Sequence, residues 1–347
     1  MEAEMLSVRT GKILNSIVGQ YIVMASPVPS QVIASDPDLA LSPATIRNEM
    51  AYLEQEGYLH RPHTSAGCIP SDKGYRYYVE SIGNMKLPQS EERFISHTLH
   101  QVEKEVEAFL SLTATLLSRM VQNIAIVSIP KSIDCKLKHM ELLALQDSMI
   151  LAVVVLHGAR VKQQLITFDQ AVSQQTLTII SNKLNIAYSG LASAQISAKD
   201  VELTPLEQKI TDHLIEIMIV EDKQDNKETY LDGLHFMLKQ PEFAQNDQVR
   251  TLMELVEHRS LLKAIVPEGL SQQTVHVIIG KENSEKAIQN CSIVISQYGL
   301  PDKATGTIGV VGPTRMTYSH TIPTVDYLSS VLSELVAGLY GKERRNS

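Results

Sequence analysis

Four polar residues of one predicted helix near the N-terminus could read bases in DNA. They are Thr45, Arg47, Asn48 and Tyr52. Arginine can make a bidentate contact to guanine and asparagine can make one to adenine, while threonine can contact the methyl group of thymine. The alternative is that these residues form the solvated face of a helix in any small domain.

The helix that carries these residues has recognisable ends and one apolar stripe. Ser42 suits the N-cap, Pro43 suits the first helical position, and Gly57 suits the end of the helix. The apolar stripe recurs at intervals of four and three residues and consists of Ile46, Met50 and Leu53. This spacing predicts that the stripe packs on a small core and that the polar residues face outwards.

Two earlier segments complete the predicted order of a helix-turn-helix. Residues 8–23 show the apolar spacing of an amphipathic helix, a Ser/Pro-rich stretch interrupts it, and residues 31–34 suit a short second helix. A third helix with the polar face then follows. Three helices in this order are typical of helix-turn-helix proteins, in which the last helix enters the major groove.

The residues after the third helix predict a wing that touches phosphates. Residues 60–67 have the composition of a turn, and the Lys-Gly-Tyr-Arg-Tyr-Tyr run at 73–78 is interpreted as the last strand, with at least one tyrosine in the core. Cations and hydroxyl groups of this kind contact the DNA backbone. The predicted DNA-binding residues are Ser42, Thr45, Arg47, Asn48, Tyr52, Arg61, His63, Thr64, Ser65, Lys73 and Arg76.

The run from Ala44 to Glu80 resembles the winged-helix region of the HrcA family, the bacterial heat-inducible transcription repressors. Two further stretches, residues 230–243 and 306–318, resemble the same family in the same order along the chain. The family usually has arginine at the position of Cys68. The resemblance therefore implies that one cationic contact of the wing is lost in this chain.

The resemblance also implies partners and a mode of action. The family's operator is the CIRCE inverted repeat, double-stranded DNA upstream of the groE and dnaK chaperone operons, and a homodimer bound there blocks transcription. A two-fold symmetric protein matches an inverted repeat because each subunit reads one half-site. The GroEL chaperonin is the implied partner that keeps the repressor active. No enzymatic activity, cofactor or metal is implied, and the expected location is the bacterial cytoplasm, at the nucleoid when bound.

The length of 347 residues and the alternation of patterns predict an α+β multidomain protein. Residues 1–82 would be the winged-helix DNA-binding domain, and 83–98 a linker and the start of a connecting helix. By resemblance, 99–172 and 270–347 would form a GAF-like domain, interrupted by a mostly helical inserted dimerisation domain at 173–269. The pattern alone predicts the interruption, and the helical block could equally be a separate domain in a monomer.

Charge and cysteine usage limit the possibilities. The net charge of −8 predicts modest non-specific binding to DNA, so the distribution of cations over the third helix and the wing matters more than the total. Three cysteines without close spacing are expected to be reduced thiols in a cytoplasmic protein, although a redox role for Cys68 stays open. No apolar run has the length of a membrane-spanning helix.

Rival functions leave few traces in the sequence. It contains no Walker-type phosphate loop, no Gly-x-Ser-x-Gly elbow and no His-Glu-x-x-His pair, which disfavours an enzyme with a winged-helix appendage. The open alternative is a regulator of another operon, in which the GAF-like region senses a small molecule. The glycine-rich stretch 309–316 is interpreted as a packing element, or Arg315 could recognise an acidic partner.

Overall fold

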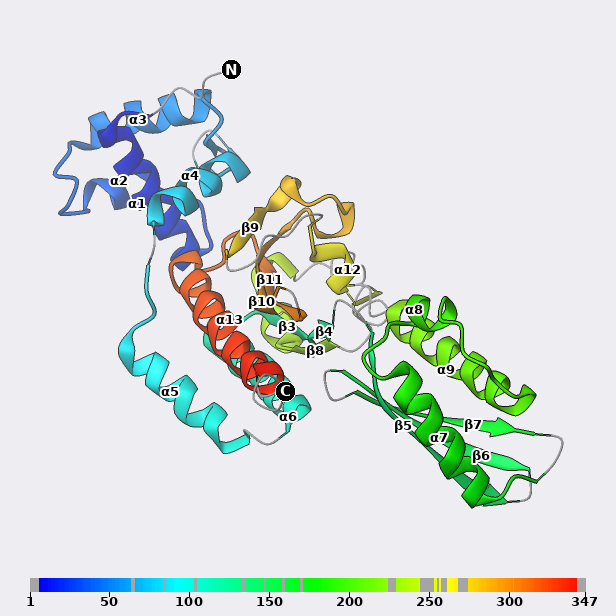
Figure 1. Ribbon diagram of the computed structural model, residues 1–347. Helices are drawn as coiled ribbons and strands as arrows, with labels where there is room; N and C mark the ends of the chain where they lie inside the picture. The colour runs from blue at the N-terminus through cyan, green and yellow to red at the C-terminus, as the bar shows by residue number, and fades with distance from the viewer. Residues whose placement is uncertain are drawn as a thin grey trace. The chain divides into compact units, whose positions relative to one another are not determined.

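The computed structural model describes residues 6–63, 66–83, 85–102, 105–132, 135–146, 148–157, 160–168, 171–223, 229–243, 253–254, 256, 261–267, 274–301 and 303–341. It divides into two compact units. The first unit comprises Met1–Ile129, Glu228–Tyr298 and Gly306–Leu332, and the second comprises Pro130–Lys227, Gly299–Thr305 and Ser333–Ser347. Each unit is mixed α and β, and each is described by itself (Figure 1).

The first unit begins with three helices and a short hairpin. Helices α1 (Val8–Met24), α2 (Ser30–Ala34) and α3 (Pro43–Gln55) precede the antiparallel strands β1 (Leu59–His60) and β2 (Ile69–Pro70). The predicted stripe of α3 is buried, with Ile46, Met50 and Leu53 at most 2% exposed. Since α1 and α3 pack together through apolar residues of this kind, burial of these side chains holds the helices in place.

The segment after the hairpin is a helix, so the prediction of a last strand is wrong. Helix α4 spans Asp72–Ile82, and the hydroxyl of Ser71 caps it by accepting a hydrogen bond from the amide of Gly74. An aspartate in the first turn adds favourable charge at that end. The expectation that one tyrosine of the run lies in the core is confirmed by Tyr75, which is 2% exposed.

A sheet completes the first unit. Its strands run in the order β8 (Thr229–Asp232), β3 (Ile124–Ser128), β11 (Ala304–Pro313), β10 (Cys291–Leu300) and β9 (His276–Ile279). Strand β4 (Lys131–Ser132) pairs with the start of β11, and these paired residues belong to the second unit. Every residue of β3 is buried. Such a strand has side chains covered on both faces, as expected for the centre of a layered domain.

Helices cover this sheet. Helix α6 (Val106–Val121) packs against β3 and β8. A separate apolar cluster joins β3, β10 and β11 to α10 (Leu234–Leu238), η2 (Pro241–Phe243) and α12 (Leu261–Ile265). Two short turns, η3 (Gly280–Glu282) and η4 (Lys286–Ile288), lie between β9 and β10, and α13 (Tyr318–Gly341) follows β11.

Two α-helices, separated by a short 3₁₀ helix, connect α4 to the sheet. Helix α5 (Gln89–Leu99) is followed by the short η1 (His100–Val102), and α6 begins at Val106. The residues from 85 to 88 therefore lead into α5, and the long apolar pattern predicted from residue 90 is divided between two helices. Among the described residues, the helices are either too short or too polar to cross a lipid bilayer.

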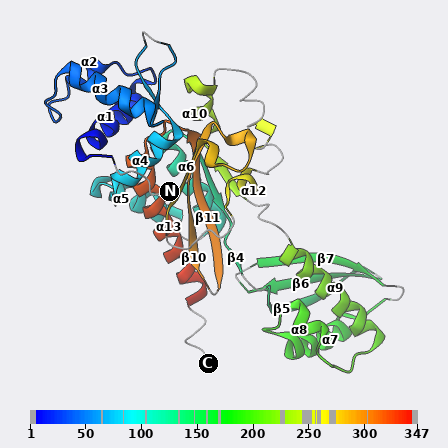
Figure 2. The same cartoon turned by 90° about the horizontal axis from the view of Figure 1, so that it is seen from above.

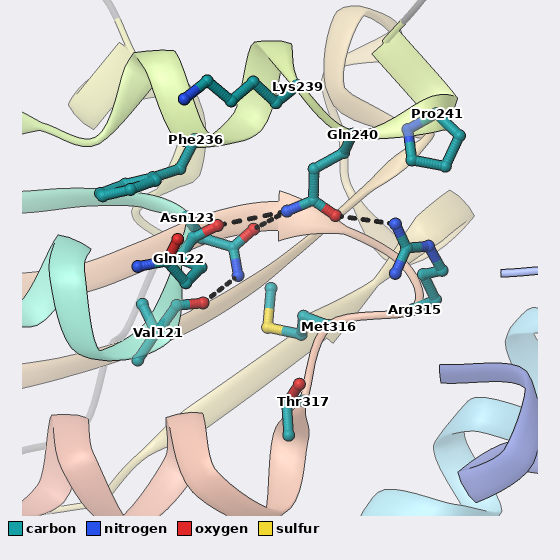
Figure 3. A pocket seen from close by; sticks show the side chains of 10 residues that line it. All are labelled: Val121, Gln122, Asn123, Phe236, Lys239, Gln240, Pro241, Arg315, Met316 and Thr317. Atoms are coloured by element: carbon teal, nitrogen blue, oxygen red, sulfur yellow. Dashed lines mark hydrogen bonds between the residues drawn. The ribbon is translucent and has the colours of Figure 1, made fainter. Parts of the chain in front are cut away.

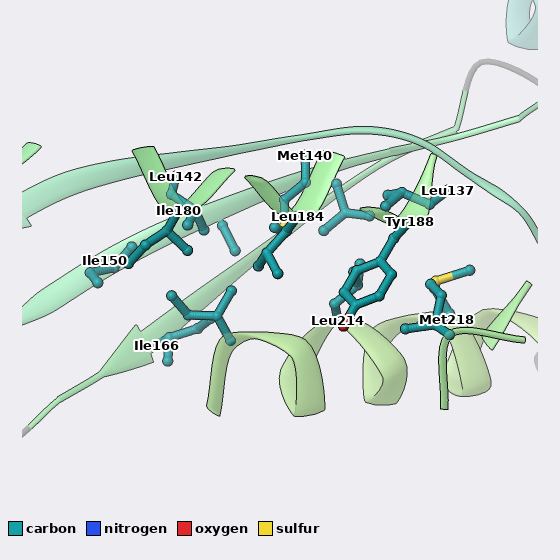
Figure 4. Packing of buried hydrophobic residues seen from close by; sticks show 14 of the residues in the cluster. Leu137, Met140, Leu142, Ile150, Ile166, Ile180, Leu184, Tyr188, Leu214 and Met218 are labelled. Carbon is teal, nitrogen blue, oxygen red and sulfur yellow. The ribbon is translucent and has the colours of Figure 1, made fainter. Parts of the chain in front are cut away.

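The second unit is a three-stranded antiparallel sheet with helices on one side (Figures 1 and 2). The strands β5 (Leu137–Gln146), β6 (Met149–Leu156) and β7 (Arg160–Thr167) are consecutive. Helices α7 (Gln174–Tyr188), α8 (Ser193–Ser197) and α9 (Pro205–Lys223) follow. Figure 4 shows strand residues such as Leu142 and Ile150 packed against Ile180, Leu184 and Leu214 of the helices.

The observed units differ from the predicted division at residues 172 and 269. Strands β5 to β7, which were assigned to the GAF-like part, form their own sheet with α7 to α9 in the second unit. Strand β8, which was assigned to the insertion, pairs with β3 of the first unit. Alternating apolar residues show that a segment is a half-buried strand, but they do not show which sheet it joins, because pairing depends on distant parts of the chain.

Candidate nucleic-acid interface

Helix α3 presents its predicted polar residues to the outside. The side chains of Arg47, Asn48 and Tyr52 are exposed, whereas the stripe from Ile46 to Leu53, which also includes Met50, is buried. Thr45 is half-buried near the start of the helix. One face of α3 therefore holds the helix in the unit, and the opposite face is exposed to solvent.

Ser42 has a structural role at the start of α3. Its hydroxyl oxygen accepts a hydrogen bond from the Thr45 amide at 3.2 Å, and the two hydroxyl groups are 2.9 Å apart. This satisfies one of the amides that a helix leaves unpaired at its N-terminus. The same bond restrains the side chain of Thr45, so the first turn of α3 is held in place by its own sequence.

Both carboxylates within α3 pair with cations. Glu49 accepts hydrogen bonds from Arg9 of α1 at 2.6 Å and from the hydroxyl of Thr10 at 2.9 Å, and Glu54 lies 3.4 Å from Arg61 of the hairpin. These pairs partly neutralise the negative charge that a phosphate backbone would otherwise meet. Arg9 is not among the predicted site residues, because nothing in the spacing of α1 and α3 shows that Arg9 and Glu49 meet.

The hairpin is fixed at its base by Cys68. This residue is fully buried. Its amide donates to the carbonyl of Val28 at 3.0 Å, and its carbonyl accepts from the amide of Val28 at 2.9 Å. Gly67 allows this close approach, because a Cβ there would lie 2.3 Å from the Val28 carbonyl carbon. The side chain at position 68 therefore points into the protein, and the loss of a cationic wing contact at this position stays a prediction.

The chemistry of Cys68 follows from its burial. Burial raises the pKa of its thiol above the ordinary value, and Arg61, which donates to the sulfur at 3.6 Å, only partly opposes this shift. The thiolate is the reactive form of cysteine. A buried thiol with a raised pKa is poorly suited to a redox role. Arg61 is thus shared between Glu54 and Cys68 and still has an exposed portion.

The two cations of α4 are used within the protein. Lys73 donates to the carbonyl of Glu56 at 2.9 Å and lies 4.0 Å from the ring centre of Tyr58. Arg76 donates to both carboxylate oxygens of Glu282 and, at 2.7 Å, to the carbonyl of Val277. The structure therefore does not bring Arg76 together with the polar face of α3.

The remaining predicted residues have different outcomes. His63 is exposed beside the hairpin. Thr64 and Ser65 lie outside the described residues. The set that the structure brings together is the exposed face of α3, with Arg61 and His63 on the hairpin that follows it. Within the described parts of the chain, His, Cys, Asp and Glu residues form no group of three that could hold a metal ion.

Comparison with known proteins identifies relatives along the whole chain. A family model for the HrcA protein C terminal domain matches residues 107–322. The heat-inducible transcription repressor HrcA of Dehalococcoides mccartyi (strain ATCC BAA-2266 / KCTC 15142 / 195) is 52% identical over 338 residues, covering 97% of this chain and 98% of the relative. The protein with the same description from Herpetosiphon aurantiacus is 35% identical over 348 residues, with 98% of both chains covered.

One solved structure has a similar fold. It is described as the crystal structure of a hypothetical protein at 2.2 Å resolution, and it is 22% identical to this chain with a TM-score of 0.64. The match covers 96% of this chain and 100% of that one. At this identity the similarity concerns the fold alone.

Proposed function

Because this chain belongs to the HrcA family of heat-inducible transcription repressors, we propose that its N-terminal segment is a winged helix-turn-helix that binds the CIRCE inverted repeat. Its relatives are described as heat-inducible transcription repressors, so the chain is a transcription repressor and not an enzyme. Repression then results because this protein, bound at the operator, blocks transcription. The proposed place of action is the cytoplasm, at the nucleoid.

The observation that carries this proposal is the two-sided character of α3. Its buried face contains the apolar stripe, and its exposed face contains Arg47 and Asn48. An exposed arginine and asparagine one residue apart can contact the edges of neighbouring base pairs in the major groove. We assign base contacts to these two residues, with Thr45 and Tyr52 supporting them.

The hairpin is the proposed wing. Arg61 and His63 are exposed on it, and Thr64 and Ser65 follow directly in the sequence. Side chains of these kinds contact phosphates, which position a protein on the duplex without reading sequence. Lys73 and Arg76 are less suited to this role, because they bond to Glu56 and Glu282 within the chain.

We further propose that the open face of the second unit forms the homodimer. Leu143, Leu151 and Leu165 lie directly opposite one another across β5, β6 and β7. Leu143 and Leu165 are exposed, as are Val161 and Met149 on the same sheet. Exposed apolar side chains grouped in this way are typical of a protein interface. A two-fold axis would place the face of one protomer against the same face of its partner.

The GroEL chaperonin is the second proposed partner. Chaperonins bind apolar surface that is exposed before assembly is complete. The apolar sheet face would be such a surface in the monomer, so the proposed dimer and the proposed chaperonin dependence have one physical basis. If so, refolding from denaturant with GroEL should recover more operator-binding protein than refolding without it, and equal recovery would contradict this part of the proposal.

The experiment that tests the assignment of α3 compares two arginine variants. Arg47→Ala should weaken binding to the inverted repeat by about 1–3 kcal/mol and should reduce the preference for the native base at one position of each half-site. Arg93→Ala removes the same charge from an exposed position of α5 and serves as the matched control. Fluorescence anisotropy on duplexes with single base changes measures both effects. Unchanged selectivity of Arg47→Ala would refute the assignment.

A further inference from the structure

A depression of about 420 Å³ lies in the first unit, at some distance along the chain from α3. It is lined by three segments that are far apart in sequence: Val121–Asn123 at the end of α6, Phe236 with Lys239–Pro241 around α10, and Arg315–Thr317 between β11 and α13. Figure 3 shows these side chains around a common space. The volume falls within the range of sites that hold small molecules.

The lining has a definite chemical character. Two cationic side chains, Lys239 and Arg315, belong to it. Because Arg315 pairs with the Glu242 carboxylate, which lies outside the lining, Lys239 supplies the positive charge available to a ligand. Phe236 and Met316 supply apolar surface, while the hydroxyl of Thr317 and several amides supply hydrogen-bonding groups. Positive charge beside an apolar wall favours a small organic anion over a cation or a fully apolar molecule.

One amide of the lining is held in a fixed orientation. Asn123 is only 3% exposed, its nitrogen donates to the carbonyl of Val121 at 2.8 Å, and its oxygen accepts from Gln240 at 3.1 Å. Gly312 leaves room for this side chain, since a Cβ there would lie 2.3 Å from the amide oxygen of Asn123. A buried polar group fixed in this way is a preorganised part of a site.

Gln240 connects this amide to Arg315. Its nitrogen also donates to the carbonyl of Gln122 at 3.2 Å, and its oxygen accepts from Arg315 at 2.9 Å, as the dashed lines of Figure 3 show. Arg315 additionally pairs with Glu242 through two nitrogens. The acidic partner of Arg315 is therefore within the chain. A ligand that bonds to Gln240 would compete directly with this network.

Arg315 also reaches the helix that supports α3. Its third nitrogen donates to the carbonyl of Ile22 in the last turn of α1, at 3.3 Å. Helix α1 in turn holds α3 through the bonds of Arg9 and Thr10 to Glu49. Arg315 thus bonds to the last turn of α1, and the first turn of the same helix bonds to Glu49 of α3.

We propose that this depression binds a small organic anion, with a carboxylate or phosphate near Lys239 and a flat apolar part near Phe236, and that its binding changes the affinity for DNA. The proposed change in DNA affinity rests on the proposed role of α3 in operator binding. The proposed binding of the anion does not depend on that role. Coupling requires that the ligand binds with different affinities to the chain with the Gln240–Arg315 bond formed and with it broken.

Calorimetry on the full chain tests the site without DNA. Benzoate, succinate and adenosine 5′-monophosphate are titrated separately at constant ionic strength, and at least one should bind with a Kd below about 1 mM. Lys239→Gln should weaken that binding about tenfold, because a charge-assisted hydrogen bond is lost. Lys286→Gln, which removes an exposed positive charge elsewhere in the same unit, should leave it unchanged.

Two results would overturn the site. The first is that all three probes bind more weakly than the millimolar range, and the second is that Lys286→Gln reduces binding as much as Lys239→Gln. The bound probe should also change the operator Kd at least threefold. If a probe binds but operator affinity is constant, the coupling is wrong and the site stands. If the protein does not bind the operator either with or without the probe, the proposed function is wrong, whatever the calorimetry shows.

Discussion

Leu165→Gln should dissociate the proposed dimer while leaving each protomer folded. Leu165 lies on the open face of the β5–β7 sheet, opposite Leu151 on the neighbouring strand. It is 57% exposed in the single chain, so a glutamine there can remain hydrated in the monomer. In a dimer formed by this face, the amide group would be buried against apolar side chains without a hydrogen-bonding partner.

The size of the effect follows from the exposure. Complete burial of a leucine side chain contributes about 1.5–3 kcal/mol. With 57% of Leu165 available for burial, its contribution per protomer is about 0.9–1.7 kcal/mol. A two-fold dimer contains the residue twice, which gives about 2–3 kcal/mol and a dimer Kd raised roughly 30- to 150-fold.

Sedimentation velocity over a range of protein concentrations measures the monomer–dimer equilibrium. Ile186→Gln provides the matched control, because this residue is 87% exposed on α7, in the helices that cover the opposite side of the same sheet. The control should dimerise like the unsubstituted protein. If Leu165→Gln dimerises equally well, or if both variants lose the dimer to the same extent, the open sheet face is not the interface.

Further predictions concern capping, acid stability and thiol reactivity. Ser42→Ala should lower the free energy of unfolding by about 1 kcal/mol through loss of the α3 cap, measured by urea denaturation, with a Ser42→Gly change expected to cost less. The pKa of Glu207 is held below its ordinary value of 4.5, chiefly by the hydrogen bond from Lys183. The Glu207 carboxylate therefore stabilises the second unit above pH 4.5. This stabilisation disappears as the pH falls through the pKa that Glu207 has in the folded protein. Glu207→Gln should therefore flatten the loss of stability between about pH 6 and pH 3, and an unchanged slope would contradict the assignment. Because burial raises the pKa of Cys68, iodoacetamide should modify it much more slowly in the native chain than in urea, as peptide mass spectrometry can measure; equal rates would show that the base of the hairpin opens readily.

The sequence predicted the N-terminal helices well, because their signals are local. The cap at Ser42, the buried stripe from Ile46 to Leu53 and the exposed polar residues of α3 all depend on spacing within one helix. The resemblance to the HrcA family, which rested on motifs distributed along the chain, is confirmed by the relatives and by the family model. The mixed α and β character is confirmed as well.

Features that depend on distant contacts were not predictable in this way. The hydrogen bond from Arg76 to Glu282 joins residues more than two hundred positions apart, and no local sequence pattern indicates it. The tyrosine-rich run was interpreted as the last strand after the wing, yet the Ser71 cap and burial of Tyr75 favour a helix there. Similarly, the orientation of Cys68 is set by its pairing with Val28 and not by the neighbouring turn.

The most direct test of the account is binding of the purified full chain to labelled DNA that carries the inverted repeat, against a scrambled duplex of the same composition, at about 50 mM and about 200 mM salt. When GroEL is present during refolding, we predict selective binding to the inverted repeat, at two protomers per repeat and at both salt concentrations. Equal weak binding to both duplexes in the presence of the chaperonin would contradict the proposed operator recognition by α3.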